Sequence, residues 1–271
     1  MNETMPTFFI PHGGGPCFFM DWSITGDPAD TWNKTADWLR QLPAGLPAKP
    51  RAIIVISGHW EEPVFTAASV ARPSLIYDYT GFPAHTYRLQ YPAPGSPDMA
   101  RHVVELLQAA GLPAGTDTTR GFDHGIFIPF LLLYPNADIP IVPLSLQQNL
   151  DPVLHLEAGR ALRSLRNEGV LIVGSGMSYH NMRGFRTAAG SEHSETFDRW
   201  LTGALTDADL RRRWSHLTQW AQAPAARAAH PREEHLLPLM VAAGAASEDP
   251  GQRLFSDTVM RGARISGYRF G

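Results

Sequence analysis

Three histidines of this 271-residue chain follow short apolar segments that have the composition of β-strands. His12, His59 and His180 each lie within seven residues of the end of such a segment. Imidazole is the commonest protein ligand of metal ions and the usual acid–base group near neutral pH. Sites in α/β sheets gather beyond the carboxyl ends of the strands, where several loops converge. The pattern therefore predicts one shared metal or catalytic pocket.

Glycines accompany all three of these histidines. Gly13–Gly15, Gly58, Gly174 and Gly176 lie close to them in the sequence. Glycine adopts backbone conformations that are closed to other residues and lets a ligand approach the chain closely. A buried histidine with a purely structural role needs no such neighbours, so the glycines favour a functional role for the group.

His124 joins the group through its local sequence, Gly121-Phe122-Asp123-His124-Gly125, just before an apolar helix expected to begin near Ile126. A neighbouring carboxylate and a helix N-terminus both change the charge state of an imidazole. We therefore expect Asp123 and the helix to tune His124.

His235 follows Glu234 at the start of a helix expected to run toward Ala243. Side chains one residue apart on a helix diverge by about 100°. Only one of Glu234 and His235 is therefore expected to face a metal. His230 is interpreted as a surface residue or as a residue behind the metal ligands.

Ser175 and Cys17 are weaker candidates for a catalytic nucleophile. Gly174-Ser175-Gly176 differs from the Gly-x-Ser-x-Gly nucleophile motif, because Val173 occupies the position of the first glycine. Cys17 is expected to be a small buried residue. The sequence contains no His-Glu-x-x-His helix, no phosphate-binding loop and no Gly-x-Gly-x-x-Gly turn.

The histidines must be positioned by an α/β fold, because short apolar segments alternate with helical patterns. We expect one domain over residues 1–271, with a central, mostly parallel or mixed sheet flanked by helices and an active site at the carboxyl ends of the strands. The segment 52–56 is apolar throughout, which predicts burial on both faces of the sheet. The expected strands are 7–10, 52–56, 139–144 and 170–173, and the expected helices are 30–39, 99–107, 151–168 and 195–205.

Three segments carry more specific expectations. Two prolines in 139–144 predict an edge or irregular strand. The stretch 65–94 is interpreted as a long ordered loop of the kind that is usually functional. The run Arg211–Arg213 lies in a polar helical pattern and is expected on a solvated helix face. Asp151 and Gly169 are expected to cap the two ends of the helix between them.

Composition excludes several classes of function. A net charge of −3 offers no basic surface for nucleic acid. The single cysteine cannot form an intramolecular disulfide, which fits a reducing compartment. The start of the chain does not have the pattern of a signal peptide, and no apolar run reaches the roughly 20 residues of a membrane-spanning helix. We expect a cytoplasmic protein that binds neither nucleic acid nor membrane. The sequence does not predict its oligomeric state.

Taken together and in order, these motifs resemble those of class III extradiol ring-cleavage dioxygenases, and within that family the subgroup typified by DOPA dioxygenases. The loop sequences Tyr77–Pro83 and Tyr91–Gly95 are also similar to that subgroup, and the resemblance runs over nearly the whole chain. The motifs are Pro11-His12-Gly13-Gly14-Gly15-Pro16, Ser57-Gly58-His59-Trp60, Gly121-Phe122-Asp123-His124-Gly125, Gly174-Ser175-Gly176 with His180-Asn181, and Glu234-His235-Leu236-Leu237-Pro238.

The resemblance implies a metal site at His12, His59 and His235, with His180 and His124 as catalytic groups. Better-known members of the family use two histidines and one glutamate, whereas His235 takes the third position here. Three protein ligands on one face leave open positions for a catechol and O2, which suits Fe(II). A three-histidine site also binds zinc readily, so the isolated protein is expected to be able to carry Zn(II).

The resemblance further implies cleavage of a catechol by O2 beside its diol, giving a muconic semialdehyde-type product. We assign His180 as the acid and base, and His124 as the donor that steadies bound oxygen. Arg183 and Arg186 are candidates for binding a substrate carboxylate, with the surface as the alternative. Five aromatic residues have two interpretations, as an aromatic wall for the substrate or as ordinary core packing: Trp60, Tyr77, Tyr79, Phe82 and Phe127.

Two other functions remain open. A zinc hydrolase would use the same three-histidine site to activate water, and would not consume oxygen. A non-catalytic binding relative is the second alternative, although it would have no need of all five histidines.

Overall fold

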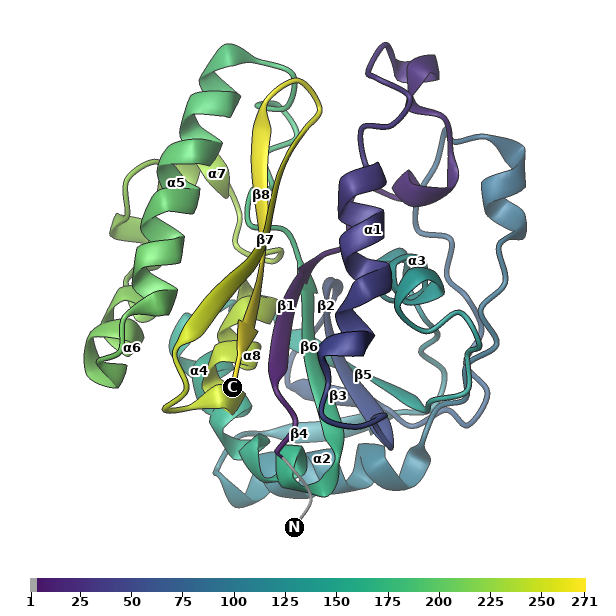
Figure 1. Cartoon of the computed structure of the whole chain (residues 1–271). Helices are drawn as coiled ribbons and strands as arrows, with labels where there is room; N and C mark the ends of the chain where they lie inside the picture. Colours follow the sequence, from purple (N-terminus) through teal and green to yellow (C-terminus); the bar gives the residue numbers. More distant parts are fainter. Residues whose placement is uncertain (1–3) are drawn as a thin grey trace.

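The computed structural model describes residues 4–271 and contains one eight-stranded mixed sheet (Figure 1). The strand order is β4-β3-β5-β2-β6-β1-β8-β7, and β5, β2, β6 and β1 run parallel to one another. Strand β8 runs antiparallel to β1, and β7 runs antiparallel to β8. The strands are β1 (Thr7–Pro11), β2 (Ala52–Glu62), β3 (Phe65–Ala68), β4 (Ala114–Asp117), β5 (Ile141–Gln147), β6 (Val170–Gly176), β7 (Gly251–Val259) and β8 (Ala263–Phe270).

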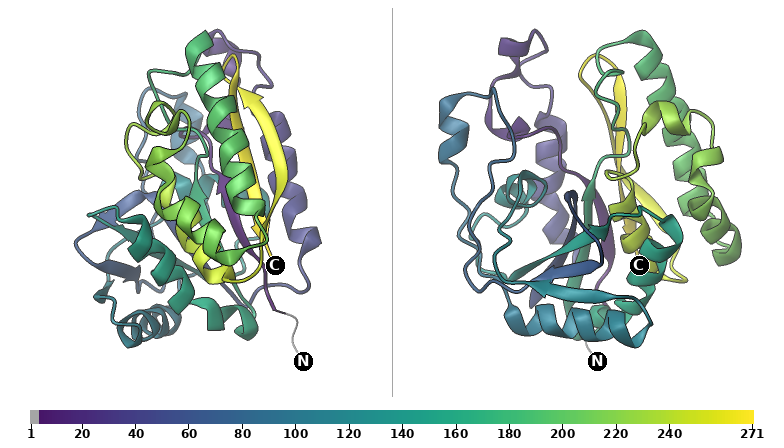
Figure 2. Two further views of the ribbon diagram at one scale, coloured as in Figure 1. Left: turned by 90° about the vertical axis from the view of Figure 1, so that its left-hand side faces the viewer. Right: turned by 180° about the vertical axis from the view of Figure 1, so that it is seen from behind.

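Helices cover both faces of the sheet (Figures 1 and 2). The α-helices are α1 (Asn33–Gln41), α2 (Pro97–Ala109), α3 (His124–Leu133), α4 (Pro152–Ala161), α5 (Ala188–Thr206), α6 (Leu210–Thr218), α7 (Ala226–Ala229) and α8 (Leu237–Ala246). The short 3-10 helices are η1 (Cys17–Phe19), η2 (Trp22–Thr25), η3 (Leu42–Gly45), η4 (Ala84–Arg88), η5 (Arg163–Glu168) and η6 (Trp220–Gln222).

The apolar sequence of β2 buries side chains on both faces, as predicted. Ile54 and Ile56 belong to a core that includes α4, α5 and α8, whereas Ile53 and Val55 belong to the core beneath α1 and α3. Alternate residues of a strand point to opposite faces, so one apolar segment supplies both cores. This rigid centre carries the loops that follow β1, β2 and β6.

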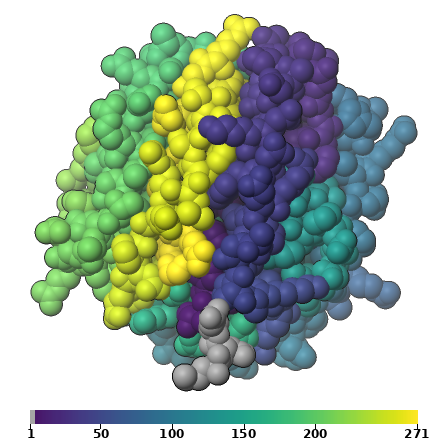
Figure 3. Space-filling model, in the orientation of Figure 1, coloured from purple at the N-terminus to yellow at the C-terminus, as the bar shows by residue number. Residues whose placement is uncertain are grey.

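The C-terminal hairpin closes one edge of the sheet. β8 pairs with β1, and β7 and β8 both contact α5. Figure 3 shows the yellow hairpin on the surface between the green segment that contains α5 and the dark blue segment that contains α1. The sequence prediction missed this hairpin and the short strands β3 and β4.

The α/β fold class and the four predicted strands are confirmed. The third predicted strand was expected to be an edge strand or an irregular one. The edge alternative is wrong, because β5 lies between β3 and β2 inside the sheet, whereas the register shift in its pairing with β2 fits the irregular alternative. Its ladder with β2 is parallel and spans Ile141 to Gln147, whereas β3 joins it through the Ala67–Leu144 bridge. Proline lacks a backbone N–H for a strand ladder, but Pro143 is tolerated within the sheet because the pairing of β5 with β3 is limited to this one bridge.

Three other expectations are corrected. The stretch 65–94 is not a continuous loop, because it contains β3 and η4. The helix expected over 151–168 has the predicted caps, Asp151 and the left-handed Gly169, but divides into α4 and η5. Arg213 is only 2% exposed and donates to the backbone oxygens of Ser247 and Glu248, so the arginine run is not a wholly solvated face.

Candidate active site

His12 lies at the carboxyl end of β1 and is held from two sides. Its backbone N–H donates to the Gly176 oxygen at 3.1 Å, which fixes it against the end of β6. Its ring Nδ1 lies 3.1 Å from Ser175 Oγ, and this hydroxyl donates to the Gly125 oxygen. Since the Ser175 proton is already used, Nδ1 of His12 is the donor and Nε2 keeps a free lone pair.

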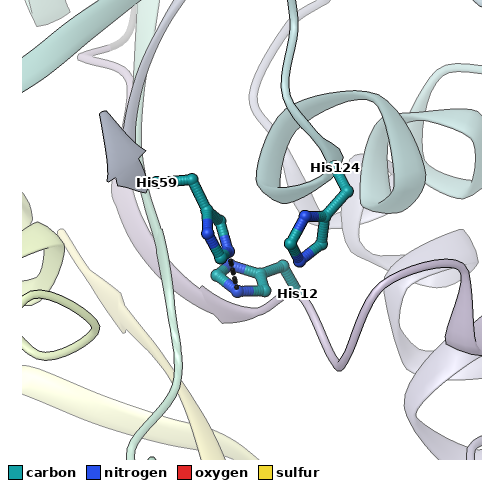
Figure 4. A group of neighbouring side chains, drawn as sticks. All are labelled: His12, His59 and His124. Carbon is teal, nitrogen blue, oxygen red and sulfur yellow. Dashed lines mark hydrogen bonds between the residues drawn. The ribbon is translucent and has the colours of Figure 1, made fainter. Parts of the chain in front are cut away.

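His59 lies in the distal part of β2, where the pairing with β5 shifts register between Ile56 and Glu61. Its Nε2 is 3.1 Å from Nε2 of His12, and Figure 4 shows this contact as a dashed line, with the His124 ring beside the two. The same atom is 3.3 Å from Nε2 of His235. Two nitrogens that each lie about 2.1 Å from one metal ion are separated by roughly 3.0–3.4 Å, so both spacings suit a shared ion.

His235 lies in the connection between α7 and α8, against the end of β6. Met177 N–H donates to the His235 oxygen at 3.0 Å. A Cβ on Gly176 would lie 2.2 Å from that oxygen, so only glycine permits this close approach. The end of β6 thus fixes the backbones of both His12 and His235.

Glu234 connects His235 to His180. One carboxylate oxygen, Oε1, is 3.0 Å from Nδ1 of His235 and 3.3 Å from Nδ1 of His180. The two imidazoles stack with their centroids 3.5 Å apart and an interplanar angle of 16°. The carboxylate therefore orients both rings and leaves Nε2 of His235 directed at His59, as a buried partner orients a metal-binding histidine.

His124 is the first residue of α3, and a carboxylate holds its side chain. The carboxylate of Asp78 accepts from the His124 backbone N–H at 3.0 Å and lies 2.8 Å from its Nδ1. Asp123 is instead bonded to Ser57 Oγ and to Arg120. Asp78 is thus the carboxylate in direct contact with His124, and the expectation that Asp123 also tunes His124 stays a prediction.

The charge states of these groups follow from burial. Burial is the main reason why the pKa values of His12 and His59 lie well below the ordinary imidazole value, and the other histidines lower them further. Burial also lowers the pKa of His235, to about 4, although Glu234 opposes the shift. Burial would raise the pKa of Glu234, but hydrogen bonds from His180 and His235 hold it well below its usual range. At neutral pH the three imidazoles are neutral and Glu234 is ionised.

Two neighbouring groups of side chains could hold a metal ion. The ligand atoms of His12, His59 and His124 lie within 4.8 Å of one another, and so do those of His180, Glu234 and His235. His59 connects the two groups through its short separation from His235. All five predicted histidines therefore meet in one place.

A cavity of about 410 Å³ opens beside this cluster. His59, His124, His180 and His235 line it, as do the glycines 13–15 after β1. The cavity gives a substrate access to the four histidines at once, whereas His12 is fully buried beneath them.

Comparison with known proteins identifies the family of this site. Residues 6–271 match the family described as the catalytic LigB subunit of aromatic ring-opening dioxygenase. The chain belongs to this family. It is an extradiol ring-opening dioxygenase, and the resemblance inferred from the motifs is confirmed.

Relatives of this dioxygenase include a protein named dioxygenase tasH from Hapsidospora irregularis, 40% identical, with 98% of this chain and 85% of the relative covered. The 4,5-DOPA dioxygenase extradiol of Beta vulgaris is 38% identical, with 93% and 91% covered. The crystal structure of an uncharacterized protein from Escherichia coli K12 superimposes with a TM-score of 0.79 at 28% identity, covering 98% of this chain and 100% of that one.

Some of the residues considered for substrate contact line the cavity. Tyr79 and Phe82 line the cavity of this dioxygenase, whereas Trp60, Tyr77 and Phe127 are not among its lining residues. Arg186 lines the cavity and Arg183 does not. The expectation for Cys17 is confirmed, because it is 1% exposed and packs in the core.

Three residues at the site were not assigned these roles from the sequence. Asp78 holds His124, Ser175 holds His12, and the side chain of Glu234 bridges two histidines. Asp78 stands in the motif Tyr77-Asp78-Tyr79, and a carboxylate between two aromatic residues was the signal available for it. Over the described residues, no helix is long and apolar enough to cross a membrane.

Proposed function

We propose that this dioxygenase cleaves a catechol-type substrate beside its diol with O2, using Fe(II) held by His12, His59 and His235. The observation that carries the proposal is the spacing of the Nε2 atoms, 3.1 Å from His59 to His12 and 3.3 Å from His59 to His235. The Nδ1 atoms of His12 and His235 each have a hydrogen-bond partner, so the Nε2 lone pairs of these two rings face His59.

His235 is preferred to His124 as the third ligand for a geometric reason. His235 Nε2 has a separation from His59 that suits a shared ion, and Glu234 orients it from behind. Glu234 is proposed to orient His235 and to remain outside the ligand set, because its Oε1 is directed at ring nitrogens. Its negative charge lies close enough to offset part of the charge of a dication.

Three neutral imidazoles suit Fe(II) and Zn(II) alike, so we expect Zn(II) to be able to occupy the site in the isolated protein. When bound, Fe(II) would hold the diol and O2 on adjacent positions and allow electrons to pass between them. The overall reaction places both oxygen atoms in a muconic semialdehyde-type product.

His180 is proposed as the acid and base. It lines the cavity, and its Nδ1 faces Glu234, so its Nε2 is the atom left to take a proton from a substrate hydroxyl and to return one later. The ionised Glu234 stabilises the imidazolium formed in between. His124, with Nδ1 on Asp78, is proposed to donate a hydrogen bond into the cavity from Nε2.

We also propose that residues 1–271 form one catalytic domain, since a single sheet runs from Thr7 to Phe270. A cytoplasmic location and the absence of nucleic-acid and membrane partners remain proposals. They are supported by the net charge of −3 and by the single buried cysteine.

The direct test is oxygen uptake by protein reconstituted anaerobically with Fe(II). The substrates are DOPA, which occurs in the names of several relatives, protocatechuate and an alkylcatechol. Uptake with a new visible absorbance is expected for at least one of them. No uptake with metal bound, together with Zn(II)-dependent hydrolysis of an ester or amide, would favour a hydrolase.

Replacing His180 with glutamine should separate proton transfer from metal binding. We expect kcat to fall by about a hundredfold, because general acid–base catalysis contributes roughly 10²–10⁴-fold. Metal content measured by elemental analysis should stay at the wild-type level. Loss of the metal would instead make His180 a ligand and overturn the division of roles.

A further inference from the structure

The cavity wall, apart from the histidines, consists mainly of large apolar side chains. Trp22, Trp32, Phe82, Met182, Phe185 and Met260 all contribute to it. Pockets of about 300–1,000 Å³ usually enclose drug-sized ligands, so a cavity of about 410 Å³ is larger than a bare catechol ring requires. The remaining space is apolar.

The apolar surface continues outward at the cavity mouth. Met182 lines the cavity and is 70% exposed, and Ile24 is 64% exposed between the lining residues Trp22 and Thr25. Clustered, solvent-exposed hydrophobic side chains at a site indicate a surface that binds an apolar ligand or partner.

Arg186 is the one arginine or lysine among the lining residues, and its charge is already paired. Its Nε donates to Oδ2 of Asp27 at 2.9 Å, and its Nη2 donates to the same oxygen. The Asp27 side chain is fully buried, and although burial alone would raise its pKa, Arg186 holds that pKa below the ordinary value. Arg261 approaches Asp27 at 3.7 Å but is 58% exposed and does not line the cavity.

Because Arg186 already binds the buried carboxylate of Asp27, it would bind the carboxylate of a substrate only weakly. A substrate carboxylate would have to leave water for an apolar wall and face an arginine whose charge is already offset by Asp27. An alkyl group would gain from the same wall.

On the basis of the proposed ring cleavage, we propose that the natural substrate is a catechol with an uncharged, apolar substituent of several carbons, seated between the Met182 side of the cavity and the paired Arg186. The Arg186–Asp27 pair acts as a specificity element against anionic catechols. The substrate class therefore differs from an amino-acid catechol such as DOPA.

The test compares kcat/KM of the Fe(II)-reconstituted full chain for 4-butylcatechol, dihydrocaffeate and the amide of dihydrocaffeate. We expect 4-butylcatechol to exceed dihydrocaffeate by at least about tenfold, since each buried methylene strengthens binding roughly fourfold. The amide, which removes the charge at matched size, should lie between them. Dihydrocaffeate equal to or better than its amide would overturn the inference while leaving ring cleavage intact.

Anaerobic calorimetric titration of the same three compounds reports the binding preference without turnover. Absence of oxygen uptake for all three, with the butyl compound still bound most tightly, would reject the proposed ring cleavage and not the apolar pocket. Equal affinities would reject the apolar pocket.

Two variants locate the preference. Met182→Gln should lower the kcat/KM ratio of 4-butylcatechol to catechol by about threefold, because it removes apolar contact at the mouth. Leu254→Gln is the matched control, since Leu254 is 41% exposed in β7 and does not line the cavity. Asp27→Asn frees Arg186 and should raise kcat/KM for dihydrocaffeate relative to its amide. An unchanged ratio in both Met182→Gln and Asp27→Asn would reject the assigned elements.

Discussion

Replacing His235 with alanine is expected to abolish ring cleavage and to remove the metal ion. Its Nε2 lies 3.3 Å from that of His59, and Glu234 keeps it in that direction. Changes to groups that merely orient a ligand weaken metal binding by about 10–100-fold, so loss of a ligand should exceed this. Elemental analysis of the purified variant and oxygen uptake with excess Fe(II) measure the two effects.

His124→Ala is the informative comparison, because His124 also lies within 4.8 Å of His12 and His59. It should retain the metal and lose turnover, since its proposed role is hydrogen bonding in the cavity. If His124→Ala loses the metal while His235→Ala retains it, the ligand set is His12, His59 and His124. Thermal melting of both variants checks that each is folded.

The sequence predicted the centre of the fold and the gathering of the histidines for the same reason. Buried parallel strands are nearly continuous apolar runs, so β1, β2 and β6 are recognisable. Residues just after such strands meet at one edge of the sheet, which placed His12, His59 and His180 together. Their metal-binding and catalytic roles remain predictions.

The missed features lack a local signal of this kind. β7 has exposed or half-exposed residues at six of its nine positions, so its alternation is weak. Asp78 reaches His124 across 46 residues of chain, a contact that no spacing rule predicts. Arg213 is buried because backbone carbonyl groups in the turn after α8, distant in the sequence, accept hydrogen bonds from its guanidinium group. Its two arginine neighbours in the sequence suggested an exposed helix face instead.

Two buried histidines outside the proposed ligand set predict strong destabilisation by acid. His155 receives a hydrogen bond from Gln147 N–H at Nε2, and its Nδ1 lies 2.7 Å from the Asp151 oxygen. Protonated Nε2 would therefore face another donor. His230 uses Nε2 on the Ser178 oxygen, and its buried Nδ1 has no hydrogen-bond partner. Burial accordingly lowers the pKa of His155 to about 4 and that of His230 to about 3.

Because both pKa values lie below that of an unfolded histidine, the unfolded chain takes up protons first as the pH falls below about 6.5. We expect each residue to remove about 2 kcal/mol from the free energy of unfolding between about pH 7.5 and pH 5, on the order of 4 kcal/mol together. Urea unfolding of wild type and His155→Gln at both pH values measures the contribution of His155. The quantity compared is the change in the free energy of unfolding between the two pH values, so a loss of stability that is the same at both pH values cancels. His216→Gln is the control, because His216 is exposed on α6. A pH dependence that is the same in wild type and His155→Gln would show that His155 does not remain neutral in the folded protein.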